Sequence, residues 1–173
     1  MIRMKAYCAP AVLFALTALL NAQVPLAQAD GSKHEGSKLV GAWIATFVVT
    51  SLPPGVPSPT QYGLTTYSSD GLVTAIQSGA TPSNPVIQNL GNQLSVAVGE
   101  WVRLDNRQFM QTIVFLIFKD GVPGGFQRSR ITLTLSENLD TYTGTGVADF
   151  LDLKGNVVAS GTATVGGTRM SWH

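Results

Sequence analysis

Few residues in this sequence have the chemistry that metal binding or triad catalysis requires. The two histidines are His34 and His173, and the single cysteine, Cys8, lies in the N-terminal segment. Zinc sites and Ser-His-Asp triads depend on histidine or cysteine inside a folded domain, so the sequence argues against both. No glycine-rich loop opens a helix, so nucleotide phosphate binding has no support either. We predict no metal site and no cofactor.

Glu100 and Tyr62 are the acid/base candidates that remain. A Glu100 side chain that faces an apolar interior would have a raised pKa and would suit proton transfer. The alternative is a solvated carboxylate at a rim, because the neighbouring Trp101 and Val102 do not settle which face is inside. Tyr62 would donate a hydrogen bond to a ligand or would serve only as a strand-favouring side chain.

A second group of residues has the composition of a small-molecule site, which combines an apolar wall with a few polar anchors. The predicted wall and its anchors are Phe47, Trp101, Phe115 and Phe150 with Tyr62, Gln127 and Ser129. These side chains would hold a hydrophobic or weakly amphipathic molecule.

Short runs with strand-like alternation must position these side chains. The predicted strands cover 39–50, 61–68, 71–78, 97–104, 108–118, 125–137, 141–152 and 156–167. Turns that contain Gly, Asp or Asn separate most of them, and no segment shows a sustained helical stripe. The pattern predicts an all-β fold, an eight-stranded antiparallel up-and-down barrel, because closure removes the exposed sheet edges.

The lengths of the links predict a cup. The second, fourth and sixth links are tight, whereas the first (51–60) and third (79–96) are long. Odd and even links of an up-and-down barrel lie at opposite rims, so one end should be closed by hairpins and the other framed by two long loops.

Alternation predicts which side chains fill the barrel. In the sixth strand Ile131, Leu133 and Leu135 share one face and point inward, whereas Arg128 and Arg130 point outward. Gln127 and Ser129 then point inward near the open rim. The strand 108–118 is apolar on both faces, so its outer face needs a cover, which would be a loop, lipid or another subunit in a homo-oligomer.

The stretch Gly41-x-Trp43 at the head of the first strand, together with Arg169 in "GGTRMSW", resembles the lipocalin and wider calycin superfamily. The resemblance implies a lipocalin-like barrel in which Arg169 packs across Trp43 at the closed end, and both residues are then structural. The chain departs from secreted lipocalins because it has no cysteine pair and no amphipathic helix after the last strand. It is more similar to short bacterial exported lipocalin-like proteins.

The N-terminal segment has the pattern of an export signal. Arg3 and Lys5 precede an apolar stretch, and "AQA" at 27–29 fits a cleavage site. We expect a signal peptide at 1–29, a flexible leader at 30–38 and one β-barrel domain at 39–173, in an exported protein that is periplasmic or secreted. The absence of a basic patch argues against nucleic acid as a partner.

Three functions are compatible with this sequence. The first is an exported barrel that binds a small hydrophobic molecule. The second is a cofactor-free isomerase or cyclase similar to the allene oxide cyclase-like barrels, with Glu100 and Tyr62 as its acid/base residues. The third is a small outer-membrane barrel, in which Trp172 resembles the terminal aromatic residue. Arg128 and Arg130 oppose the third function unless they line the lumen.

Overall fold

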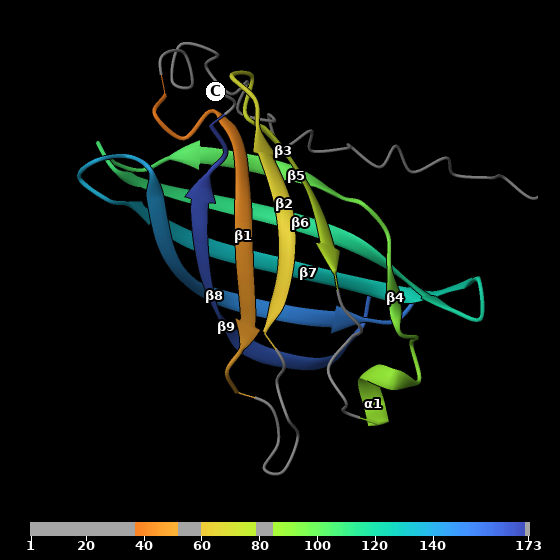
Figure 1. Ribbon diagram of the computed structural model, residues 1–173. Coiled ribbons are helices and arrows are strands. Elements are labelled where there is room, and N and C mark those ends of the chain that lie inside the picture. Colours follow the sequence, from red (N-terminus) through yellow and green to blue (C-terminus); the bar gives the residue numbers. More distant parts are fainter. Residues whose placement is uncertain (1–36, 52–59, 79–84, 172–173) are drawn as a thin grey trace, which may run out of the picture.

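The computed structural model describes residues 37–51, 60–78 and 85–171 and contains nine strands and one short helix in these ranges (Figure 1). The elements are β1 (Gly41–Val49), β2 (Gln61–Tyr67), β3 (Leu72–Ser78), α1 (Pro85–Gln88), β4 (Gln93–Leu94), β5 (Ala97–Arg103), β6 (Gln108–Lys119), β7 (Val122–Leu135), β8 (Thr141–Leu151) and β9 (Val157–Arg169). Within these ranges no helix is long and apolar enough to span a membrane. The predicted signal peptide lies outside the described residues.

The strands form a closed antiparallel barrel. Neighbours in the chain pair from β1 to β3 and from β5 to β9, and β9 returns to pair with β1. β4 and β5 both pair with the same edge of β6, so together they occupy one position and the barrel has eight. The predicted fold class is confirmed.

The predicted strands agree with the observed ones to within a few residues, with one omission. Gln93 and Leu94 pair with Phe118 and Ile117 of β6, although the sequence around them was assigned to a long link. The reason is that "GNQLS" has the composition of a turn. The fourth strand position therefore begins earlier in the chain than the sequence suggested.

The two ends of the barrel differ as the link lengths predict. The turns at 68–71, 104–107 and 136–140 lie at one end, which we call the closed end. β1 and β3 end at the other, the open end, where α1 also lies (Figure 1). Ile87 and Leu90 pack there against Ile117 and Phe150, so α1 and the turn after it cover part of this rim.

The closed half of the barrel is filled by aromatic side chains. Trp43, Tyr142, Tyr67, Trp101 and Phe109 form a continuous series in which successive ring centroids lie 5.0, 6.5, 6.2 and 5.7 Å apart. Such tilted and edge-to-face contacts add to the free energy of burial. This half of the barrel is a packed core.

The inner and outer faces of β7 have the predicted orientation. Ile131, Leu133 and Leu135 are buried in the core, and Arg128 and Arg130 lie outside, where both donate to Asp149. An outer-membrane barrel has a polar interior and an apolar outer band, which is the reverse of this arrangement. The arginines do not line a lumen, so their objection to the outer-membrane alternative stands.

Candidate functional site

Arg169 and Trp43 close one end of the barrel. They are register partners on β9 and β1, and the guanidinium carbon lies 4.3 Å from the centroid of the indole ring. The guanidinium also donates to the carbonyl oxygens of Val40, at 3.0 Å, and Leu139, at 3.2 Å, and to that of Lys38. These bonds hold the chain before β1 and the turn after β7 across the closed end.

The chain before β1 is part of this closure. Trp43 Nε1 donates to the carbonyl oxygen of Leu39 at 2.9 Å, and the Leu39 side chain is completely buried. Ser37 is buried, and its hydroxyl oxygen accepts from the Leu39 amide at 3.3 Å. The predicted leader at 30–38 therefore ends too late, because Ser37 and Lys38 already belong to the folded structure.

Trp101 belongs to the closed end and does not line the open half. Its amide donates to the Gly71 carbonyl at 2.8 Å and its Nε1 donates to the Ser68 carbonyl at 3.1 Å, both in the turn between β2 and β3. The sequence prediction counts Trp101 among the ligand residues and begins its strand at residue 97, without β4. With β4 in place, Trp101 lies late in the fourth strand position, so it is not in position to contact a ligand near the open rim.

Five of the other predicted ligand residues lie in the open half. Phe115 and Phe150 are the register partners of Gln127 on either side, so the three side chains form one inward row across β6, β7 and β8. Ser129 lies two residues further along β7, and Gln127 Nε2 lies 3.4 Å from its hydroxyl oxygen. Phe47 points inward from β1, next to Gln61 of β2.

Several inward side chains of the open half stay slightly accessible, although Phe115 and Phe150 there are fully buried. Seven inward side chains keep 5–8 % of their surface accessible: Phe47, Val49, Gln61, Gln127, Ser129, Ala163 and Val165. The inward aromatic residues of the closed half keep only 0–2 %. Small side chains contribute to this difference, because Ala75, Ala97, Ala148 and Ala163 face the interior here. The open half thus has the features of a small-molecule site, with an apolar wall and uncharged polar groups.

Tyr62 and Glu100 do not lie in this site. Tyr62 is 59 % exposed on the outer wall, and Glu100 is exposed beside the inward-facing Trp101. Adjacent residues of a strand point to opposite faces, so a buried Trp101 places Glu100 outside. The prediction that Tyr62 orients a ligand inside the barrel is wrong. The isomerase alternative loses both of its acid/base residues.

Gln61 is a candidate site residue that the sequence prediction missed. It is 7 % exposed and lies on the inner face next to Phe47. The polar groups that point inward are therefore the amides of Gln61 and Gln127 and the hydroxyl of Ser129. The sequence feature that could have identified Gln61 is its even spacing from Tyr67, the buried aromatic residue at the other end of β2, since residues at even spacing share one face of a strand. The apolar residues Tyr62 and Leu64 suggested instead that the opposite face of β2 points inward.

No family model matches this chain, and no curated protein or solved structure is significantly similar to it. The site must therefore be interpreted from its own geometry.

A buried polar pair lies in the closed half. The Tyr67 hydroxyl donates to Gln111 Oε1 at 2.6 Å in the interior. Burial raises the pKa of Tyr67 well above its usual range, and burial also raises the pKa of Tyr142 to about 12. Both phenols therefore stay protonated at neutral pH, which suits structural hydrogen bonding and not proton abstraction.

Asp149 forms a separate charged cluster on the outer wall near the open end. Its carboxylate accepts from Arg128 and Arg130 at 2.9 Å each and from the Ser160 hydroxyl at 2.7 Å. Desolvation alone would raise the pKa of Asp149, but these hydrogen bonds and the two positive charges outweigh it and lower the pKa below its ordinary value. The cluster stabilises the wall and is directed away from the interior.

The described part of the chain offers no group of three or more His, Cys, Asp or Glu side chains that would hold a metal ion. Its inward residues in the open half are apolar or uncharged. This composition supports binding of an apolar molecule and supplies neither a general base nor a nucleophile with a lowered pKa.

Proposed function

We propose that this protein is an exported barrel that binds one small, hydrophobic or weakly amphipathic molecule in the open half of its interior. The observation that carries the proposal is the difference between the two halves. The aromatic side chains of the closed half are sealed from solvent, whereas Phe47, Gln61, Gln127 and Ser129 keep 5–7 % of their surface accessible beside the buried Phe115 and Phe150. An eight-stranded barrel has room for one small ligand.

The ligand that fits this interior is neutral. The inward groups that offer hydrogen bonds are the amides of Gln61 and Gln127 and the hydroxyl of Ser129. Burial of an ionised group without a paired charge is very costly, and these groups carry no charge. An alcohol, ketone or ester with an apolar body would place its oxygen near Gln127 and Ser129 and its body against Phe47, Phe115 and Phe150.

The calycin-like arrangement supports the same proposal. Arg169 stacks on Trp43 and closes one end, so a ligand would enter from the end that carries the long links. The sequence "AQA" at 27–29 supports export through a cleaved signal peptide to the periplasm or beyond. A binding protein of this kind would carry or sequester its ligand outside the cytoplasm.

Native mass spectrometry of the protein purified from its own host tests the proposal. We expect a co-purifying neutral molecule that is released on unfolding. Binding of dodecanol and dodecanoate to the stripped protein gives a matched comparison, in which the alcohol should bind and the carboxylate should bind much more weakly. No adduct and no binding of either compound would refute the proposal, and a preference for the carboxylate would refute the neutral-ligand part of it.

A further inference from the structure

One hydroxyl group inside the barrel has no hydrogen-bond partner. In the ranges that the structure describes, two buried side-chain polar atoms lack one, Thr65 Oγ1 and Arg128 Nε. Arg128 belongs to the charged cluster on the outer wall, whereas Thr65 is 1 % exposed in the interior. An unpaired buried hydroxyl destabilises a fold, and valine has nearly the same shape without this penalty. The threonine therefore needs a reason other than packing.

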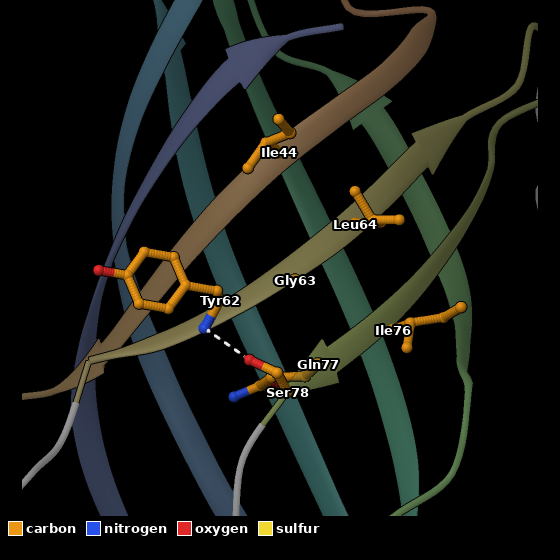
Figure 2. Close-up of a pocket in the computed structure, with 7 residues that line it drawn as sticks. All are labelled: Ile44, Tyr62, Gly63, Leu64, Ile76, Gln77 and Ser78. Carbon is orange, nitrogen blue, oxygen red and sulfur yellow. Dashed lines mark hydrogen bonds between the residues drawn. The ribbon is translucent and has the colours of Figure 1, made fainter.

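Strand alternation directs Thr65 into the barrel. Tyr62 and Leu64 are exposed and line a groove on the outer wall (Figure 2). Thr65 follows Leu64, so it points the opposite way, as do Gln61 and Tyr67 at even spacing from it. Thr65 thus shares the inner face of β2 with Gln61 of the open half.

Small residues adjoin Thr65 on the side of the open half. Its register partner on β3 is Ala75, and Ala75 pairs in turn with Ala97 of β5. Gly63 is the next inward position of β2 toward the open end, and its partner on β1 is Ala45. None of these four residues carries a side chain larger than a methyl group. Thr65 therefore borders the space that we propose for the ligand.

The closed half does not supply a partner for this hydroxyl. Trp43, the register partner of Thr65 on β1, donates its indole N–H to a main-chain carbonyl oxygen, and the Tyr67 hydroxyl donates to Gln111. The hydroxyls of Tyr67 and Thr65 lie close enough to Tyr142 to offset part of the rise that burial causes in its pKa. The contact between Thr65 and Tyr142 does not have the geometry of a hydrogen bond, because Thr65 Oγ1 has no partner.

We propose that the Thr65 hydroxyl binds an oxygen atom of the ligand at the inner end of the open half. The inference rests on the proposed function and adds one requirement to it, since the ligand then carries a second oxygen besides the one near Gln127 and Ser129. A threonine hydroxyl both donates and accepts, so a hydroxyl or a carbonyl oxygen fits. The described residues next to Thr65 carry no charge, so this second group is neutral as well.

The position of Thr65 also sets the length of the ligand. Thr65 lies four residues from Gln61 along β2, which corresponds to about 13 Å of strand and to an extended chain of about ten carbon atoms. The ligand class that fits is a neutral, chain-like molecule of about this length with an oxygen near each end. Diols, hydroxyketones and hydroxyesters have this chemistry.

Calorimetric titration of the full chain with 1,10-decanediol and with decanol tests the proposal. Thr65→Val should weaken binding of the diol about five- to tenfold, because one of its hydroxyls then lacks a partner. The same change should alter binding of decanol less than about twofold. Thr65→Ser keeps the hydroxyl and should retain binding of the diol. Thr66→Val, on the exposed face of the same strand, is the matched control and should change neither affinity.

The stability of the ligand-free protein distinguishes a binding role of Thr65 from a structural one. Thr65→Val should leave the melting temperature unchanged or raise it by about a few degrees, because it removes an unpaired hydroxyl. A lower melting temperature together with unchanged binding of the diol would show that this hydroxyl is paired in the folded protein, with Tyr142 as the nearest candidate. That result would overturn the proposal.

Failure of the Thr65 inference differs from failure of the proposed function. If the wild type binds both compounds and Thr65→Val binds them equally well, only the Thr65 inference is wrong. Binding of decanol alone by the wild type, or equal weakening of both compounds by Thr65→Val, refutes the second oxygen. If the wild type binds neither compound, both proposals are wrong. Circular dichroism confirms that each variant is folded, and comparison of Thr65→Ala with Thr65→Ser provides the same test if Thr65→Val is not.

Discussion

The guanidinium of Arg169 stacks on the indole ring of Trp43 and at the same time donates to the carbonyl oxygens of Val40 and Leu139. One side chain therefore ties β9, the chain before β1 and the turn after β7 into a single cap. Because the charge stays partly in contact with solvent and donates three hydrogen bonds, the cap avoids the cost of a bare buried charge.

Arg169→Ala should lower the free energy of unfolding by about 2–4 kcal/mol, since it removes the stacking contact and leaves carbonyl oxygens without donors. Arg169→Lys should lose less, because an ammonium group keeps the charge but cannot reach all the acceptors. Urea unfolding followed by circular dichroism measures both. Arg107→Ala is the control at the same end, where the Arg107–Glu137 pair is exposed and 3.8 Å apart, so its effect should stay within about 0.5 kcal/mol.

The buried pair of Tyr67 and Gln111 should show strong coupling. Tyr67→Phe leaves Gln111 Oε1 without its donor and should lower the free energy of unfolding by about 1–2 kcal/mol. Gln111→Leu should lower it by a similar amount, because the Tyr67 hydroxyl then lacks this acceptor. The double variant should cost less than the sum of the two, since both polar groups are then gone. Strict additivity in a double-mutant cycle would show that the hydrogen bond contributes nothing.

Asp149 should make stability depend on pH in the acid range. Its folded-state pKa is lowered, so the stability it contributes is present above its unfolded-state pKa of about 4 and is lost as the pH falls through the folded value. Asp149→Asn should cost about 2–3 kcal/mol at pH 7, and the gap from the wild type should narrow below about pH 4. Thermal unfolding across this range measures the effect. Asp120→Asn, in the exposed turn after β6, should leave the profile unchanged, and an equal gap at all pH values for Asp149→Asn would contradict the prediction.

Ala163→Leu should abolish ligand binding with little loss of stability. Ala163 faces the open half, and the larger leucine side chain would occupy the space proposed for the ligand. In a barrel without such space the same change would overpack the core and cost about 1–3 kcal/mol. Dodecanol titration together with thermal unfolding separates the two outcomes. Thr164→Leu, the exposed neighbour on the outer face, is the matched control and should preserve binding.

The barrel itself was predictable because its turns and link lengths are marked by residue type. Gly, Asp and Asn occur where the chain reverses, and the long first and third links indicate which rim is open. The row of Ile131, Leu133 and Leu135 against Arg128 and Arg130 predicted the inner face of β7 for a barrel with an apolar interior. β4 was not predicted, because its two paired residues lie inside a segment with the composition of a loop.

The inner faces of β2 and β5 were harder to predict because both sides of these strands carry apolar residues. Tyr62 and Leu64 look like core residues, yet they are exposed on the outer wall, and the inner face of β2 carries Gln61 and Tyr67 instead. Glu100 and Trp101 are adjacent and cannot both point inward. Hydrophobic alternation identifies a core only where the outer face is polar, as it is in β7.

The described chain enters and leaves the barrel at the closed end, where the Met170 amide donates to the Ala42 carbonyl at 2.9 Å. A fusion partner or surface tether attached at Ser171 would therefore sit at the pole opposite the open end. The same neighbourhood makes the fold a candidate for circular permutation. A short linker from Ser171 to Ser37, with new ends opened in the exposed hairpin at Asp120 and Gly121, would leave every barrel pairing intact.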